Sequence, residues 1–236
     1  SGASSFTLID HFLVESVDDE SLNDILCTVN LQSGASEPYH NVEIDIVLPL
    51  SLNQAGFPSE NITIKSSPTI ADLNVDSSSE IYFGAENESF YGFDETGTIL
   101  DGFPIDINGG IRSSPAVADL DNDGDKEIVF GSNNGRLTIL NSDGSQNNIY
   151  QISGGINGSP ALYDLDGDMD LEIVFTSDYN SSGTVDAIHH NGEDFENFPV
   201  NIGEKMLVGA AIGDLEDDGE VDIVVCTWGE NIYVLT

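Results

Sequence analysis

Hydrophobic positions along the chain form short runs of strand length, separated by polar, glycine-rich segments. The pattern is clearest in the runs Pro115 to Leu120, Ile128 to Phe130 and Leu137 to Leu140. Continuous runs of β-branched and aromatic residues are typical of strands buried on both faces. The Asn-Gly and Asp-Gly pairs between such runs predict hairpin turns, because these residues tolerate positive φ. No segment shows a 3.6-residue pattern of good helix formers, so we predict an all-β fold.

This order of short strands recurs in four segments that align without gaps. They are SSPTIADLNVDSSSEIYFG from Ser66, SSPAVADLDNDGDKEIVFG from Ser113, GSPALYDLDGDMDLEIVFT from Gly158 and VGAAIGDLEDDGEVDIVVC from Val208. A period of about 40–50 residues indicates a β-propeller or a solenoid. Because each repeat holds four predicted strands, it corresponds to one propeller blade.

The fourth strand of each unit carries Gly-Phe-Pro or a relic of it, at Gly56–Pro58, Gly102–Pro104, Tyr150–Ile152 and Asn197–Pro199. Proline suits an outermost strand, which needs no hydrogen-bond donor on its free side. The last unit shows three strands, whereas a strand over Gly56 to Ile64 precedes the first unit. We therefore expect that strand to complete the last blade and close a propeller of four blades over residues 54–236. The alternative is part of a seven- or eight-bladed propeller.

Residues 1–53 do not fit the repeat. The runs Phe6 to Glu15, Ile25 to Gln32 and Val42 to Leu48 predict three strands. Three strands are few for an independent sandwich. We expect a β-rich N-terminal arm or partial sandwich that packs on the propeller, extends it or pairs with a neighbouring molecule.

Each repeat places oxygen-bearing side chains at positions 1, 3, 5 and 9 of an acidic loop, and position 7 would offer its main-chain carbonyl. Alternate acids on a tight loop point inward, and a glycine at position 6 permits the bend. Hard oxygen donors without His or Cys favour Ca²⁺. The candidate ligands are Asp72, Asn74, Asp76, Ser78 and Glu80 in the first loop; Asp119, Asp121, Asp123, Asp125 and Glu127 in the second; Asp164, Asp166, Asp168, Asp170 and Glu172 in the third; and Asp214, Glu216, Asp218, Glu220 and Asp222 in the fourth.

The loops are not EF-hands, because position 12 is an apolar strand residue such as Phe130 instead of Glu. The segments DLDNDGDKEIVFG and DLDGDMDLEIVF resemble the FG-GAP or VCBS repeat family, and the resemblance covers roughly residues 56–236. These are the calcium-binding propeller blades of integrin α-chains and of many secreted bacterial proteins. The resemblance implies three to four structural Ca²⁺ ions and an extracellular or cell-surface location. Ser77 and Met169 replace the family's glycine at position 6. These departures bear on the expected calcium affinity and not on the expected fold.

The chain is strongly acidic, with 5 Lys and Arg against 43 Asp and Glu and a net charge of −38. This charge excludes an ordinary nucleic-acid or anionic-membrane partner. It leaves two explanations open, a solvated acidic surface and acids gathered around divalent ions. No apolar run reaches the roughly 18–20 residues that span a bilayer, and no export-signal pattern follows Ser1. Cys27 and Cys226 allow one long-range disulfide or two free, buried thiols.

The sequence shows no GxSxG, HExxH, CxxC or phosphate-binding glycine motif. His189 and His190 alternate across a strand end, so their rings diverge and form a poor metal pair. We therefore expect a non-enzymatic extracellular module for adhesion or self-assembly. Its partners would be other proteins or copies of itself, joined head to tail through the N-terminal arm. One alternative is a carbohydrate-binding module that stacks sugars on Trp228 with Tyr91, Tyr163 and Tyr179, and a further one is a polysaccharide-degrading enzyme.

Overall fold

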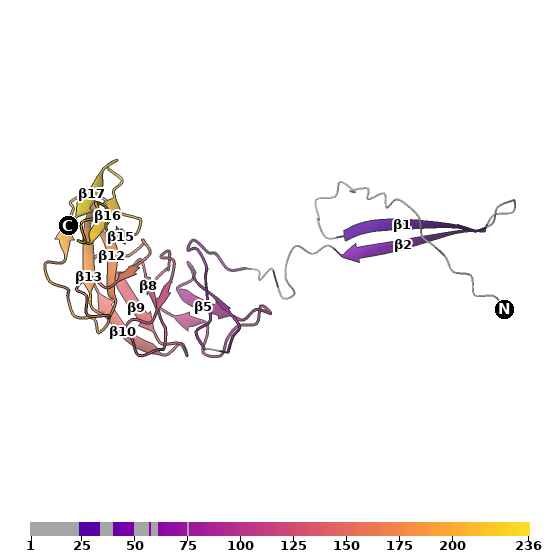
Figure 1. Cartoon of the computed structure of the whole chain (residues 1–236), viewed down its shortest axis with the longest axis horizontal. Helices are drawn as coiled ribbons and strands as arrows, with labels where there is room; N and C mark the ends of the chain where they lie inside the picture. The colour runs from indigo at the N-terminus through magenta and orange to yellow at the C-terminus, as the bar shows by residue number, and fades with distance from the viewer. Residues whose placement is uncertain (1–23, 34–39, 50–56, 58–60, 75) are drawn as a thin grey trace. The chain divides into compact units, whose positions relative to one another are not determined.

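The structure, a computed structural model, describes residues 24–33, 40–49, 57, 61–74 and 76–236 (Figure 1). The chain divides into two compact units, Ser1–Pro58 and Ser59–Thr236. In the first unit, β1 (Asp24–Ser33) pairs with β2 (His40–Pro49) as an antiparallel hairpin. These two strands confirm the predictions over residues 25–32 and 42–48. The strand predicted over Phe6 to Glu15 lies outside the described residues.

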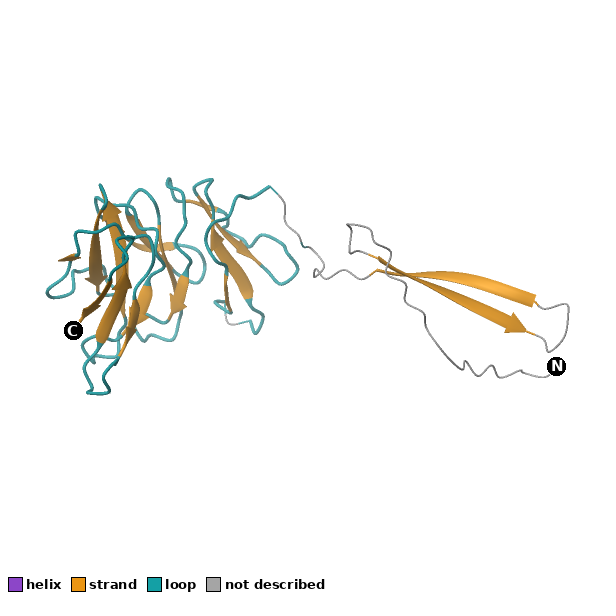
Figure 2. Ribbon diagram, turned by 90° about the horizontal axis from the view of Figure 1, so that it is seen from above, coloured by secondary structure: helices purple, strands orange, loops and turns teal. Residues whose placement is uncertain are grey.

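The second unit contains four antiparallel sheets, one for each repeat, with their strands in chain order. Figure 2 shows its strands and the loops that connect them. The first sheet is β3 (Thr69–Ala71), β4 (Glu80–Gly84), β5 (Ser89–Phe93) and β6 (Ile105–Asp106); the second is β7 (Ala116–Ala118), β8 (Glu127–Gly131), β9 (Arg136–Leu140) and β10 (Gln146–Gln151); the third is β11 (Ala161–Tyr163), β12 (Glu172–Tyr179), β13 (Ser182–Ile188) and β14 (Val200–Asn201); the fourth is β15 (Ala211–Gly213), β16 (Asp222–Cys226) and β17 (Ile232–Leu235). Within the described ranges, no helix is long and apolar enough to cross a membrane.

Consecutive sheets pack face to face, and a separate apolar core lies between each pair. In the second sheet, Ile128 and Phe130 pack against the first sheet, whereas Val129 packs against the third. The ring of Phe130 stacks on that of Phe90, with 4.1 Å between the centroids. Alternate residues of one strand therefore enter two different cores. This arrangement is the physical reason for the continuous apolar runs, because neither face of a middle strand meets water.

The first strands of the sheets are coupled by the Ser-Pro pairs at their beginnings. The main-chain N–H of Ser67 donates to Ser114 Oγ over 2.8 Å, and the N–H of Ser114 donates to Ser159 Oγ over 3.1 Å. Gly209 takes the equivalent position in the fourth repeat. It lies so near the third repeat that a Cβ there would come within 2.2 Å of the Ser159 carbonyl oxygen. The serines of the recurring SSP and GSP segments thus form hydrogen bonds between neighbouring sheets.

Closure of a four-bladed ring is not confirmed. Of the predicted closing strand, the part at residues 61–64 contacts the first sheet: Ile64 forms a bridge with Ala85, and Ile62 packs against the aromatic cluster of that sheet. Among the described elements, the fourth sheet has three strands and β15 makes no contact with β3. The outer side of the fourth sheet is therefore open, with Ile232 71% and Val234 45% exposed.

Candidate metal sites

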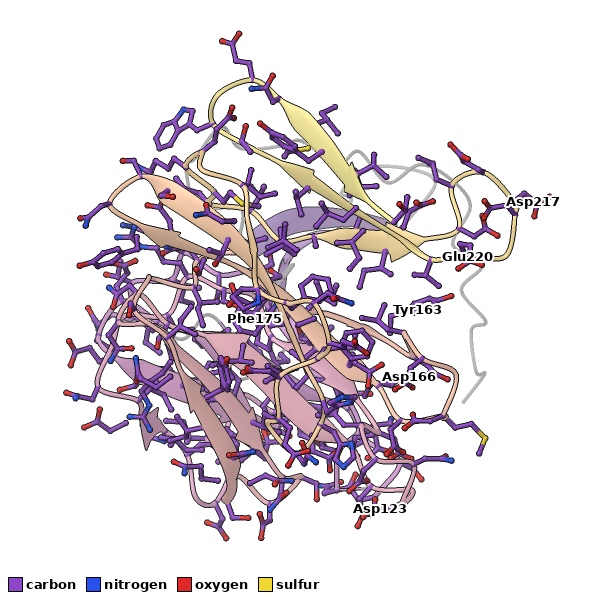
Figure 3. The ribbon with its side chains drawn as sticks, turned by 90° about the vertical axis from the view of Figure 1, so that its left-hand side faces the viewer. Asp123, Tyr163, Asp166, Phe175, Asp217 and Glu220 are labelled. Carbon is purple, nitrogen blue, oxygen red and sulfur yellow. The ribbon has the colours of Figure 1, made fainter. Side chains whose placement is uncertain are left out.

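The four acidic loops occupy equivalent places, each connecting the first strand of a sheet to the second. Figure 3 shows Asp123, Asp166, Asp217 and Glu220 along one side of the unit, whereas Phe175 lies between the sheets. Because the sheets pack in sequence order, one repeated loop yields a row of acidic loops along that side. The position of every loop follows from the fold of its own repeat.

All four loops share a hydrogen bond that closes the bend. The carboxylate at position 1 accepts from the main-chain N–H at position 6: Asp72 from Ser77 (3.1 Å), Asp119 from Gly124 (2.9 Å), Asp164 from Met169 (3.1 Å) and Asp214 from Gly219 (2.8 Å). Position 6 has positive φ in every loop, with values of 76°, 100°, 82° and 91° in the same order. The bend predicted at position 6 is confirmed, and Ser77 and Met169 adopt it despite their side chains.

A second shared hydrogen bond anchors each loop to the sheet. The acid at position 9, the first residue of the second strand, accepts from the main-chain N–H at position 2: Glu80 from Leu73 (3.2 Å), Glu127 from Leu120 (3.0 Å), Glu172 from Leu165 (2.7 Å) and Asp222 from Leu215 (2.9 Å). These four acids are 0–6% exposed. The side chain at position 5 accepts in turn from the N–H at position 7, over 2.7–3.0 Å in all four loops. Every loop is thus fixed by three corresponding hydrogen bonds.

Three of the loops bring carboxylate oxygens to within 4.8 Å of one another. The groups are Asp72, Asp76 and Glu80 in the first loop, Asp119, Asp121 and Glu127 in the second, and Asp164, Asp166 and Asp168 in the third. Among the described residues of the fourth loop, no three of the side chains Asp214, Glu216, Asp218, Glu220 and Asp222 form such a group. At position 7, Ser78, Asp125, Asp170 and Glu220 contribute a main-chain N–H to the loop framework. Asn74 at position 3 accepts from the N–H of Asp76 over 3.0 Å.

The electrostatics of the loops favour a bound cation. Burial raises the pKa of Glu127 and of Glu172, and the neighbouring Asp121 and Asp123 raise the pKa of Glu127 further. Oδ1 of Asp72 is buried without a hydrogen-bond partner among the described atoms. A buried carboxylate facing other carboxylates is costly unless a positive charge compensates it. Clustered oxygen donors of this kind fit Ca²⁺.

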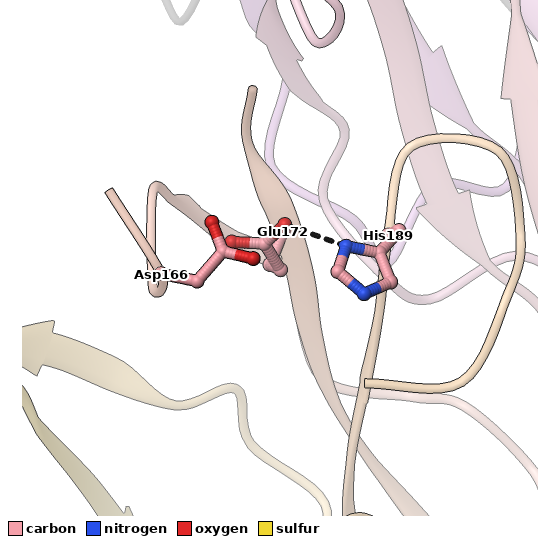
Figure 4. A group of neighbouring side chains, drawn as sticks. All are labelled: Asp166, Glu172 and His189. Carbon is pink, nitrogen blue, oxygen red and sulfur yellow. Dashed lines mark hydrogen bonds and ion pairs between the residues drawn. The ribbon is translucent and has the colours of Figure 1, made fainter. Parts of the chain in front are cut away.

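The third loop also contacts a histidine that the loop spacing did not assign to it. His189 Nδ1 lies 3.0 Å from Oε1 of Glu172, and Asp166 lies beside them (Figure 4). His190 Nδ1 lies 3.3 Å from Oδ2 of Asp170. The two rings reach different acids, in line with the expected divergence of the two side chains. The contact follows from the strand register, which the loop spacing does not contain: pairing of Ile173 with Ile188 places His189 beside Glu172.

Of the four aromatic residues predicted to stack sugars, three are exposed and Tyr91 is buried. Trp228 is 66% exposed, and Lys205 Nζ lies 4.3 Å from its ring centroid. Tyr163 and Tyr179 are exposed, whereas Tyr91 is buried and stacks on Phe83. The inclusion of Tyr91 was therefore wrong, because its ring belongs to the core of the first sheet.

The structure describes the side chain of one of the two cysteines, Cys226. Cys226 is a free, exposed cysteine, not a buried one. The side chain of Cys27 lies outside the described residues.

Comparison with known families bears on the repeat directly. Residues 119–175 match the model of the FG-GAP-like repeat. The predicted resemblance to this family is confirmed. The matched segment runs from position 1 of the second loop into β12, so it includes the complete second and third loops. No curated protein matches the chain significantly.

Solved structures resemble the chain in fold. A crystal structure of BBS1N in complex with ARL6DN, soaked with lead, has a TM-score of 0.51 at 13% identity and covers 95% of this chain and 63% of that one. The mercury-soaked complex gives a TM-score of 0.46 at 14% identity, with coverages of 89% and 60%. The crystal structure of BamB from Moraxella catarrhalis has a TM-score of 0.37 at 11% sequence identity and covers 91% of this chain and 67% of that one. This chain thus spans less than two thirds of the length of the BBS1N chain in each of the two complexes. The first likeness supports an all-β, propeller-like arrangement of the sheets and nothing about activity.

Proposed function

We propose that the chain is a calcium-binding β-propeller module of a secreted or cell-surface protein, and that it acts in adhesion or assembly instead of catalysis. One observation carries the proposal. Four loops with different sequences share the same three hydrogen bonds, and each loop ends on a buried acid at the start of a middle strand. A buried carboxylate beside other carboxylates is costly unless a positive charge compensates it, so the shared framework favours ion binding.

Calcium in these loops would be structural. Oxygens from positions 1, 3, 5 and 9 would hold the ion and tie the exposed loop to the buried strand. At a free calcium concentration of about 100 times Kd, each site would add roughly 2.7 kcal/mol. Three such sites would rival the roughly 5–15 kcal/mol by which whole domains are stable. Extracellular modules bind calcium at about 10⁻⁴–10⁻³ M, which suits a module exposed to extracellular calcium.

Thermal unfolding of the whole chain with calcium and with a chelator tests this role. We expect a higher Tm in calcium and three to four bound ions per chain after dialysis. Glu127→Gln should reduce the bound calcium by one ion. Glu196→Gln removes the same charge from an exposed position outside the loops and serves as the matched control. A Tm that is indifferent to chelation would reject the proposal.

The fourth sheet supports the assembly role. Ile232 and Val234 are exposed on the side of β17 that faces away from the third sheet, and β17 is the outer strand among the described strands of its sheet. An exposed apolar strand with unpaired main-chain groups can accept a strand from another molecule. The covering strand would come from another blade or from the arm of a neighbouring copy. A carbohydrate-binding role has less support, because Lys205 covers one face of Trp228.

Light scattering coupled to size-exclusion chromatography tests the assembly role. Association of the whole chain should be lost in Val234→Asp and in a variant without residues 1–53, and it should persist in Thr236→Asp. A wild-type chain that is monomeric at all concentrations would contradict self-assembly. Equal association of all variants would show that it uses a different surface.

A further inference from the structure

The third loop differs from the other three at the residue that follows the third strand of its sheet. The middle strands have the same register in every repeat: Ile173 pairs with Ile188 as Ile128 pairs with Leu140. The residue next in sequence is Asp94, Asn141, His189 and Thr236 in repeats one to four. This position lies beside the buried acid of the loop. The third repeat therefore offers its loop an imidazole nitrogen.

The imidazole of His189 is held next to the loop oxygens. Its Nδ1 lies 3.0 Å from Oε1 of Glu172, which is fully buried, and Asp166 supplies a third ligand atom within 4.8 Å of the other two (Figure 4). Two ligands about 2.1 Å from a metal ion, at tetrahedral or octahedral angles, lie roughly 3.0–3.4 Å apart. The observed separation of Nδ1 and Oε1 falls within that range.

Two main-chain hydrogen bonds hold the backbone at His189. The main-chain N–H of His189 donates to the carbonyl of Glu193 over 2.9 Å, and its carbonyl accepts from Gly192 over 2.9 Å. The ring packs at 5.2 Å from Phe195, measured between centroids. Asn141 closes the corresponding turn of the second repeat with the same two hydrogen bonds. The backbone at this position is thus the same in the two repeats, and the side chain alone differs.

We propose that the third loop is a site for a first-row transition-metal ion, taken by Zn²⁺ through Asp166, Glu172 and His189, while the all-oxygen loops take calcium. The inference rests on the proposed metal binding by the loops and distinguishes one of them. Imidazole suits zinc and its neighbours in the first transition row, whereas Ca²⁺ takes oxygen ligands. One nitrogen and two carboxylate oxygens leave a further position for water or for Asp164 or Asp168.

The test uses the whole chain, stripped of metal and then saturated with calcium. Titration with Zn²⁺ should show one tight site per chain. Outer-shell partners of metal ligands alone are worth about 10–100-fold in affinity, so loss of a ligand in His189→Asn should weaken zinc binding at least tenfold. His190→Asn should leave zinc binding unchanged. Asn141→His should add a second zinc site, in the second loop.

A spectroscopic measurement separates a metal ligand from a plain hydrogen-bond donor. With one equivalent of Cu²⁺, an ion that imidazole suits, added to the calcium-saturated chain, electron spin-echo spectra should show ¹⁴N modulation from an imidazole in the wild type and none in His189→Asn. Zinc binding that is insensitive to His189→Asn, or a wild type without the modulation, would overturn the inference. Bound calcium is measured in the same samples, so its absence would reject the proposed function separately. His189→Asn introduces the residue that the second repeat already carries, and its melting curve confirms that it folds.

Discussion

The positive φ at position 6 of the loops predicts opposite changes in protein stability for substitutions in two of the loops. An L-residue in the left-handed region costs about 1–2 kcal/mol, and Gly→Ala recovers about 0.4–1 kcal/mol from the unfolded chain. Gly124 has φ of 100°, and a Cβ added there would meet no heavy atom within 4 Å. Gly124→Ala should therefore destabilise the protein through backbone strain alone, by about 0.5–1 kcal/mol. Met169 has φ of 82° and is 70% exposed, so Met169→Gly should stabilise it by a similar amount.

Thermal unfolding followed by circular dichroism, in chelator and in calcium, measures both effects. For a unit of this size, 1 kcal/mol corresponds to roughly 2–4 °C in Tm, so we expect shifts of about 1–4 °C with opposite signs. Both shifts should appear without metal, since the strain belongs to the backbone. Gly213→Ala, which has open space and no positive φ, is the control. A lower Tm for Met169→Gly, or no change for Gly124→Ala, would refute the reasoning.

Three further outcomes follow from the packing and the buried acids. Gly209→Ala should lower the urea midpoint far more than Gly213→Ala, because its Cβ would meet a main-chain oxygen at 2.2 Å. Phe130→Ala should cost about 3–5 kcal/mol in denaturant unfolding, since its ring is fully buried between two sheets. In chelator, protein stability should rise as the pH falls from 7 towards 5, because burial raises the pKa of Glu127 and of Glu172 and the folded state then binds more protons. The double variant Glu127→Gln with Glu172→Gln should show a smaller rise in stability. An equal rise would show that it comes from the net negative charge of the whole chain.

The local features of the fold could be predicted from the sequence, because each depends on a few neighbouring residues. The run Ile128 to Phe130 predicted a strand buried on both faces, and β8 contributes to two cores. The acid spacing predicted the loops, and the glycine at position 6 predicted their bend. The same strand and loop patterns recur in every repeat, so the prediction for one repeat supports the prediction for the others.

The features that depend on distant contacts were not accessible in the same way. The predicted completion of the last sheet by residues 56–64, which is not confirmed, would require pairing across almost the whole repeat region, and a Gly-Phe-Pro marker does not specify the partner strand. The proximity of His189 to Glu172 depends on the register between two strands, which composition does not reveal. Sequence spacing therefore identified the acids that cluster within a loop, but it missed the imidazole that the neighbouring strand places beside them.

The fourth loop tests whether the shared framework is sufficient for ion binding. The first loop has Ser77 in place of the family's glycine at position 6, yet Asp72, Asp76 and Glu80 converge there. In the fourth loop, Asp222 keeps the hydrogen bond from Leu215. Its side chain is one methylene shorter than the Glu of the other loops, and no group of three acids forms among the described residues of this loop. We therefore expect the fourth loop to be the weakest calcium site.

Asp222→Glu should restore the missing reach and strengthen the weakest calcium-binding step, with the tighter steps unchanged. Calorimetric titration of the metal-free chain measures each step, and Glu127→Asp in the second loop should produce the opposite change in a tighter step. The longer side chain has to fit a position that is 4% exposed, so the stability of the metal-free variant is measured alongside. If neither exchange alters calcium affinity, the length of the position-9 acid is irrelevant and the hydrogen-bonded framework alone sets the site.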